Sequence, residues 1–178
     1  MTRVLRLFAL TACFSATTAC QGTTTPSAPP GPATITFNGL TAGAAVGNYT
    51  ESGFTISATP GNWIALTTYG NPAPFIEFFV DAGSVTGQVA VFADGHTPFR
   101  FQSVDLYSSV TRIPYDITGV RSDAPVFTVS DTLPNTFGNF RTVVNPDSAD
   151  LIDTLIIRLT NSSPGRNPMG LDNIVLTR

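Results

Sequence analysis

The residues that could perform acid–base or nucleophilic chemistry are few and scattered along the chain. The 178 residues include two glutamates, ten aspartates and a single histidine. Glycosidases need two carboxylates that flank one bond, but the acids here lie largely at turn-like positions and their spacing pairs none of them. No G-x-S-x-G elbow, phosphate-binding loop or H-E-x-x-H motif occurs. We therefore expect a protein that is not an enzyme.

The histidine, His96, lies two residues after Asp94 in FADGHTPF, so the two side chains could act as an acid–base pair or bind a metal. One histidine without cysteine cannot build a typical closed zinc site. The dipeptide Asp94-Gly95 is typical of a tight hairpin turn. The turn is the stronger interpretation.

Four aromatic side chains could form a platform on which sugar rings stack: Trp63, Tyr69, Tyr107 and Tyr115. Aromatic rings combine an apolar face with polar edges. Trp63 follows TPGN and Tyr69 precedes GNPAP, so both lie near loops, where binding residues tend to occur. The alternative is packing in the core, which is the commoner fate of large aromatics. Core packing is favoured, and the platform is kept as the second interpretation.

The elements that position these side chains read as β-strands rich in Val, Ile, Phe, Tyr and Thr, separated by Gly, Pro, Asn and Asp. No ten-residue stretch has helical periodicity. The apolar alternation changes parity after Phe101, which predicts a β-bulge near Ser103. Many short strands at close spacing predict an all-β sandwich or barrel. The predicted strands are 33–37, 53–58, 63–69, 75–80, 87–92, 99–107, 114–121, 125–130, 139–144, 153–160 and 171–177.

The N-terminus is typical of an export signal. Arg3 and Arg6 precede an apolar run, 7–19, that suits a signal peptide and is too short to span a bilayer. The stretch SATTACQG resembles the lipobox of bacterial lipoproteins, which implies that Cys20 becomes the lipidated first residue. Cleavage before the alternative, Cys13, would leave only six residues after the last arginine, below the usual length of about 7 to 15. We therefore prefer Cys20.

Net charge and composition limit the classes of partner that the protein could bind. The whole chain carries a formal charge of −3, and removing Arg3 and Arg6 with the signal leaves −5. This acidic excess argues against a nucleic-acid partner. The segment after Cys20, QGTTTPSAPPGP, has no charge and no large apolar residue, so it predicts a flexible linker that joins the lipid to the folded body.

Four pieces of the body occur in an order that resembles a known group: TFNGL, YTESGFTIS, FRFQSVDLYSS and the terminal GLDNIVLT. They resemble secreted bacterial β-sandwich domains that are related in pattern to galactose-binding-like jelly rolls. The resemblance covers roughly residues 33–178. It implies a two-sheet antiparallel jelly roll in which the first and last strands lie close together. The characterised jelly rolls bind carbohydrate or other surface ligands.

The same resemblance implies a structural calcium ion, because jelly rolls of this type often use one to tie the N-terminal region to the final strand. Calcium takes six to eight oxygen ligands, and Asn38, Glu51, Asp172 and Asn173 could supply some of them. Alternatively, Asp172 and Asn173 shape the turn into the last strand through hydrogen bonds to the backbone. The lack of a dense acidic repeat favours this alternative.

Together these features predict a signal peptide (1–19), a lipid-anchored flexible linker (20–32) and one β-sandwich domain (33–178). We expect an exported lipoprotein, held at the outer membrane or cell surface by its N-terminal lipid. Its expected role is non-catalytic binding of polysaccharide or another surface ligand. The alternative is a structural or spacer protein of the envelope with no small-molecule ligand.

Overall fold

The computed structural model of the chain describes residues 31–59, 63–68, 74–78, 83–162 and 165–178. The predicted signal peptide, both cysteines and most of the linker lie outside these residues. Within them no helix is long and apolar enough to cross a membrane. The strands are β1 (Pro32–Ile35), β2 (Asn48–Glu51), β3 (Phe54–Ala58), β4 (Trp63–Leu66), β5 (Phe75–Phe78), β6 (Val85–Ala93), β7 (Arg100–Ser108), β8 (Ile113–Arg121), β9 (Ala124–Leu133), β10 (Arg141–Val144), β11 (Thr154–Asn161) and β12 (Met169–Thr177).

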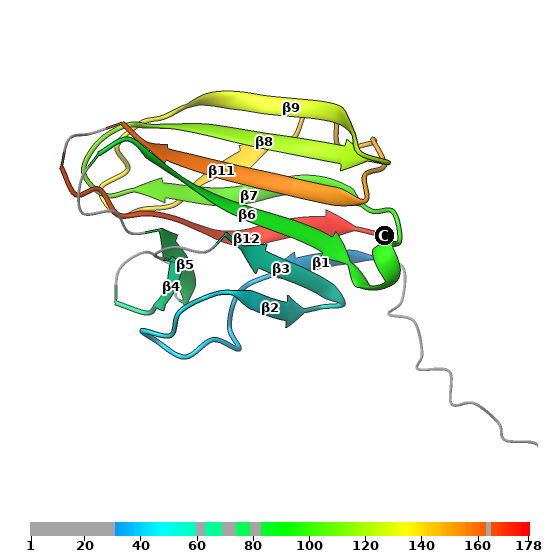
Figure 1. The fold of residues 1–178 in the computed structure, drawn as a ribbon, viewed down its shortest axis with the longest axis horizontal. Coiled ribbons are helices and arrows are strands. Elements are labelled where there is room, and N and C mark those ends of the chain that lie inside the picture. Colours follow the sequence, from blue (N-terminus) through cyan, green and yellow to red (C-terminus); the bar gives the residue numbers. More distant parts are fainter. Residues whose placement is uncertain (1–30, 60–62, 69–73, 79–82, 163–164) are drawn as a thin grey trace, which may run out of the picture.

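The strands form two antiparallel sheets that pack face to face (Figure 1). Sheet A has the order β10-β7-β12-β5-β4, with β1 also paired to β12. Sheet B has the order β2-β3-β6-β11-β8-β9. The protein is therefore an all-β, two-sheet sandwich of jelly-roll type, which confirms the predicted fold class.

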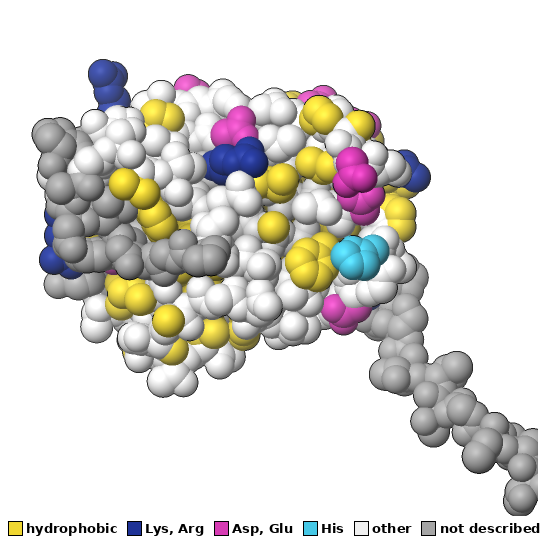
Figure 2. Space-filling view, viewed as in Figure 1, with side chains coloured by type: hydrophobic (Ala, Val, Ile, Leu, Met, Phe, Trp, Pro, Cys, Tyr) yellow, Lys and Arg dark blue, Asp and Glu magenta, His cyan; other side chains and the backbone are white. Residues whose placement is uncertain are grey.

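Alternation along the strands builds the core between the sheets. In β11, Leu155, Ile157 and Leu159 are fully buried, whereas Ile156 and Arg158 between them are half-buried on the outer face. Successive side chains of a strand point to opposite faces, so apolar residues at every second position all lie on the same face. The outer face of sheet B accordingly carries apolar side chains separated by polar ones (Figure 2).

The first and last strands lie side by side, as the resemblance implied: Ile35 pairs with Ile174, and Pro32 with Thr177. The predicted bulge in β7 is confirmed as well. Leu176 pairs with Phe101 and Val175 with Ser103, so one extra residue of β7 interrupts the register there. The bulge explains the change of parity, since Phe101 and Val104 both face the core.

Strand β2 was missed by the sequence analysis. Its sequence, NYTE, offers one apolar residue, and as an edge strand paired only with β3 it buries little surface. A turn is present at Asp94-Gly95, but the predicted hairpin is wrong: residues 94–96 form a single 3-10 turn that crosses from β6 of sheet B to β7 of sheet A, and these two strands do not pair. His96 is exposed there, with its ring stacked on Phe92 at 5.4 Å between centroids.

Candidate functional site

An open groove of about 920 Å³ lies on the outer face of sheet A. Ile64 and Leu66 of β4 line it, alternating with Trp63 and Ala65, which face the core. Glu77 of β5 and Tyr107 of β7 lie beside them. The rest of the lining comes from the loops at this end of the sandwich: Thr68, Ser109, Val110, Phe137, Gly138, Arg166 and Pro168.

A buried polar pair sits at the base of the groove. The Tyr107 hydroxyl donates a hydrogen bond to the Glu77 carboxylate, and the two residues are 1% and 5% exposed. Burial raises the pKa of Glu77, although the Tyr107 hydrogen bond and the nearby positive charge of Arg166 oppose the rise. Burial and the charge of Glu77 raise the pKa of Tyr107 as well. Gly170 of β12 leaves room for the Tyr107 ring, which a side chain at that position would strike.

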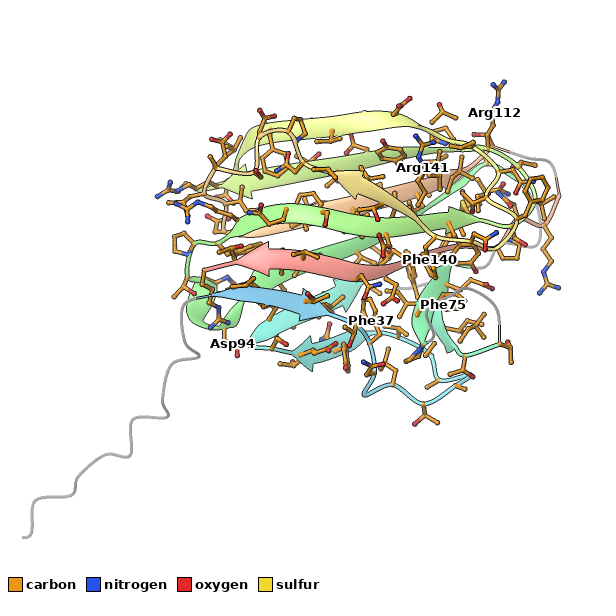
Figure 3. All side chains as sticks on the ribbon, turned by 180° about the vertical axis from the view of Figure 1, so that it is seen from behind. Phe37, Phe75, Asp94, Arg112, Phe140 and Arg141 are labelled. Carbon is orange, nitrogen blue, oxygen red and sulfur yellow. The ribbon has the colours of Figure 1, made fainter. Side chains whose placement is uncertain are left out.

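The Tyr107 ring also belongs to a small aromatic cluster on the outer face of sheet A. Phe75, Tyr107 and Phe140 meet edge-to-face, with centroids 5.2 to 5.5 Å apart. Phe75 and Phe140 are seen close together in Figure 3. Phe75 is fully buried although it lies outside the main core. The cluster therefore fixes the β9–β10 loop, residues 134–140, against the sheet.

Hydrogen bonds fix the same loop at a second point. The backbone amide and the hydroxyl of Thr136 both donate to the Ser108 carbonyl, each at 3.1 Å, and the Ser108 amide donates back to the Thr136 hydroxyl at 3.0 Å. The Asn135 amide group donates to the Val110 carbonyl at 2.8 Å, and its oxygen accepts from the Phe137 amide at 2.8 Å. The loop is thus tied to Ser108, the last residue of β7, and to Val110 just after it.

These anchors hold Phe137 outward at the rim of the groove. Its side chain is 80% exposed, and its backbone has φ 52°, a left-handed conformation that is unfavourable for a bulky residue. Val110 on the facing turn is 53% exposed. The fully buried Asn167 fixes that turn, because its oxygen accepts from the backbone amides of Val110 and Thr111. Strain and exposure of a large apolar side chain at one place point to a function.

The four aromatic residues predicted as a sugar-stacking platform do not form one surface in the structure. Trp63 is fully buried against Phe78, 5.2 Å between ring centroids, so its faces are closed to a ligand. Tyr107 lines the groove, but at 1% exposure it serves as floor and not as an open stacking surface. Tyr115 is half-buried in a separate hollow. Tyr69 lies outside the described residues.

Two of the four residues predicted to bind calcium are carboxylates, Asp172 and Glu51, and the structure gives them different surroundings. Asp172 is 1% exposed, and within the described chain its Oδ1 has no hydrogen-bond partner. Burial, and then the charges of Asp105 and Glu51, raise the pKa of Asp172 to about 7. Glu51 itself accepts from the backbone amides of Thr36 and Phe37 at 3.1 and 2.9 Å, which ties β2 to the end of β1.

The other two predicted calcium ligands are the asparagines Asn173 and Asn38. The Asn173 amide group donates to Asp105 at 3.0 Å, and Asn38 is exposed. The described residues contain no group of three or more His, Cys, Asp or Glu side chains that could hold a metal ion. The calcium site stays a prediction.

Of the described groove lining, sequence reasoning had named only Tyr107; the residues it missed include the two charged ones, Glu77 and Arg166, and the exposed Phe137. Glu77 had a usable signal, because a single acid in the apolar run FIEFFV must be buried on one face of its strand. For Phe137 the signal was weaker. A phenylalanine before glycine in NTFGN lies in a polar turn, where apolar burial cannot account for it.

Solved structures with a similar fold were found. A family 29 carbohydrate-binding module from Piromyces equi aligns over 83% of this chain and 90% of its own, with 11% identity and a TM-score of 0.50. A family 11 module from Clostridium thermocellum, in complex with a β-1,3-1,4-mixed-linked tetrasaccharide, aligns over 84% and 96%, with 17% identity and a TM-score of 0.41. No protein-family model and no curated protein matches the sequence. At 11% identity and a TM-score of 0.50, the likeness to the family 29 module shows a shared β-sandwich fold and no more.

Proposed function

We propose that this protein is a non-catalytic carbohydrate-binding module whose ligand lies in the groove on the outer face of sheet A. The observation that carries the proposal is Phe137, which is 80% exposed in a strained backbone conformation on a loop that is hydrogen-bonded to Ser108 and to Val110. A solvent-exposed phenyl ring held so firmly supplies a stacking surface for one face of a pyranose ring.

The chemistry of the groove fits an oligosaccharide. Sugars present apolar ring faces and hydroxyl edges, so their sites combine apolar walls with a few fixed polar groups. Ile64, Leu66 and Val110 provide apolar wall, and the carboxylate of Glu77 with the guanidinium of Arg166 provides hydrogen-bonding groups of both kinds. An open volume of about 920 Å³ exceeds what one sugar ring needs, which favours a chain of several units.

The groove supports binding more than hydrolysis. Glu77 is the one carboxylate in its described lining, and glycosidases use two, about 5 to 10 Å apart. The solved family 29 module of similar fold is named as a carbohydrate-binding module, which agrees with this proposal.

We also propose that the module is exported and held in the envelope through a lipid on Cys20. The lipobox-like SATTACQG and the uncharged segment that follows it support this placement. A membrane tether of this kind would present the sandwich, and with it the groove, to polysaccharide at the cell surface.

A glycan array that carries several polysaccharide classes, probed with the full-length protein, tests the function. The proposal predicts reproducible binding to at least one neutral polysaccharide. A blank array, from protein shown to be folded by circular dichroism, would contradict it and favour the structural role in the envelope.

A further inference from the structure

A second hollow, of about 220 Å³, lies where the edges of the two sheets approach each other. Strands β8 and β9 of sheet B form one side, and the short strand β10 of sheet A forms the other. Loop 134–140, which crosses from β9 to β10, closes one end with Pro134. We call this hollow the edge cleft.

The floor of the edge cleft is apolar and its walls are open to solvent. Leu133 and Val143 are 1% and 8% exposed and belong to the main core. Tyr115 is half-buried on one wall, packed against that core, so part of its ring faces the cleft. The short strand β10 lines the opposite wall, and its Val144 is 66% exposed. The half-buried ring of Tyr115 is therefore the one aromatic surface among the described residues of the cleft.

Two exposed charged groups of opposite sign complete the walls. Asp131 pairs with Tyr115 across β8 and β9, and Arg141 begins β10 (Figure 3). All three residues line the edge cleft. Their charges act on Tyr115 as well: after burial, Asp131 raises the pKa of Tyr115 and Arg141 lowers it.

Much of their hydrogen-bonding capacity is left open. Asp131 accepts from the backbone amide of Thr132 at 2.6 Å through Oδ1, which leaves Oδ2 with no protein donor in the described chain. The Arg141 guanidinium makes no hydrogen bond or ion pair with any described residue. A guanidinium carries five donors and a carboxylate several acceptor positions. Both sets lie beside the exposed part of an aromatic ring.

We propose that the edge cleft is a second carbohydrate site, which binds a single neutral sugar residue such as the end of a glycan chain. Vicinal hydroxyls both donate and accept, so they satisfy Asp131 and Arg141 together, while the ring stacks on Tyr115. The charges of Asp131 and Arg141 cancel, so the described lining of the cleft has no net charge that would favour an ionic ligand over a neutral one. The volume is about a quarter of that of the groove, 220 against 920 Å³, which limits the cleft to a short ligand.

The edge cleft is distinct from the groove, and the proposal does not depend on binding there. The two sites share no described lining residue. They do share loop 134–140, which borders the cleft at Pro134 and the groove at Phe137. A protein with both sites could bind several units of a glycan chain in the groove and a terminal unit in the edge cleft.

The test uses three neutral probes, the methyl glycosides of mannose, galactose and glucose, titrated into the full-length chain. Its tyrosines carry ¹³C labels, and Tyr115→Phe assigns the Tyr115 signals. The signals of Tyr115 should move with at least one glycoside. Arg141→Ala should weaken that binding at least about tenfold, whereas Arg112→Ala, another exposed arginine, should leave it unchanged.

Three outcomes would overturn the proposal: no movement of Tyr115 with any probe, equal weakening by the two arginine variants, or loss of the Tyr115 response in Phe137→Ala. The last would assign the binding to the groove. Unperturbed tyrosine signals of each variant before titration establish that it is folded. The proposal that the groove binds glycan is tested separately: it fails if Phe137→Ala does not weaken binding to polysaccharide.

Discussion

The Tyr107 hydroxyl donates a hydrogen bond to the Glu77 carboxylate from one strand of sheet A toward another, beneath the candidate groove. Both groups are almost fully buried, on the face of the sheet that lies away from the core. A buried carboxylate is tolerated because this hydroxyl, with the field of Arg166, compensates part of the lost hydration. The pair therefore gives the groove a fixed polar point in an apolar floor.

Replacement Tyr107→Phe should destabilise the protein by about 1 to 3 kcal/mol, since it leaves a buried acceptor without its donor. The loss should be larger above about pH 7 than near pH 4. Burial already raises the pKa of Glu77, so the folded state holds its proton more tightly than the unfolded state and loses stability as pH rises. The Tyr107 hydrogen bond lowers the pKa of Glu77, so removing it raises that pKa further and increases the loss of stability at high pH.

Urea unfolding at the two pH values measures it. In a Glu77→Gln background, which keeps an acceptor but no charge, Tyr107→Phe should show no extra loss at the higher pH. An equal loss with and without the charge of Glu77 would contradict this account.

Asp172 predicts a second pH dependence. In chelator, the free energy of unfolding should fall as pH rises from about 4 to about 7, because the folded pKa is raised from 3.8 to about 7. The full decrease is on the order of 4 kcal/mol. Asp172→Asn should flatten the profile and be more stable than the parent at about pH 8. The exposed Asp123→Asn is the matched control, and a flat parent profile would refute the prediction.

Calcium should act at the same place if the predicted site exists. Thermal unfolding at neutral pH with chelator, and then with excess calcium, measures the difference. An ion that binds only the folded state at a hundredfold excess over its Kd raises stability by about 2.7 kcal/mol. Unchanged melting on addition of calcium would rule out the predicted site. A gain retained in Asp172→Asn would place the ion elsewhere.

The membrane tether is tested by Cys20→Ser and, separately, Cys13→Ser in a bacterial host. Removal of the lipidated cysteine should release the protein from the membrane fraction, since a thioether-linked lipid cannot form on serine. We expect release with Cys20→Ser and retention with Cys13→Ser. The reverse pattern would overturn the preferred cleavage site.

Much of the fold was predictable because the signal is local. Alternation placed Leu155, Ile157 and Leu159 on one face, and the parity change after Phe101 located the bulge in β7. Strand β2 escaped prediction, because an edge strand with one apolar residue carries no such alternation.

The candidate site was less predictable than the fold. Trp63 and Phe137 illustrate why: their exposure depends on long-range packing, which buries the tryptophan beside Phe78 and leaves the phenylalanine in solvent. Aromatic character alone could not distinguish them. The hydrogen bonds that tie the loop of Phe137 to Ser108 and Val110 join residues 25 or more positions apart in sequence, so no local pattern reveals them.

The most direct measurement is calorimetric titration of the full-length protein with the strongest glycan from the array, comparing Phe137→Ala with Val126→Ala. Val126 is also an exposed apolar residue, 41% exposed, but it lies on β9 away from the groove lining. Loss of a stacked ring should weaken binding about five- to tenfold, while Val126→Ala should bind like the parent. Equal affinity of the two variants would show that the glycan does not bind in the groove.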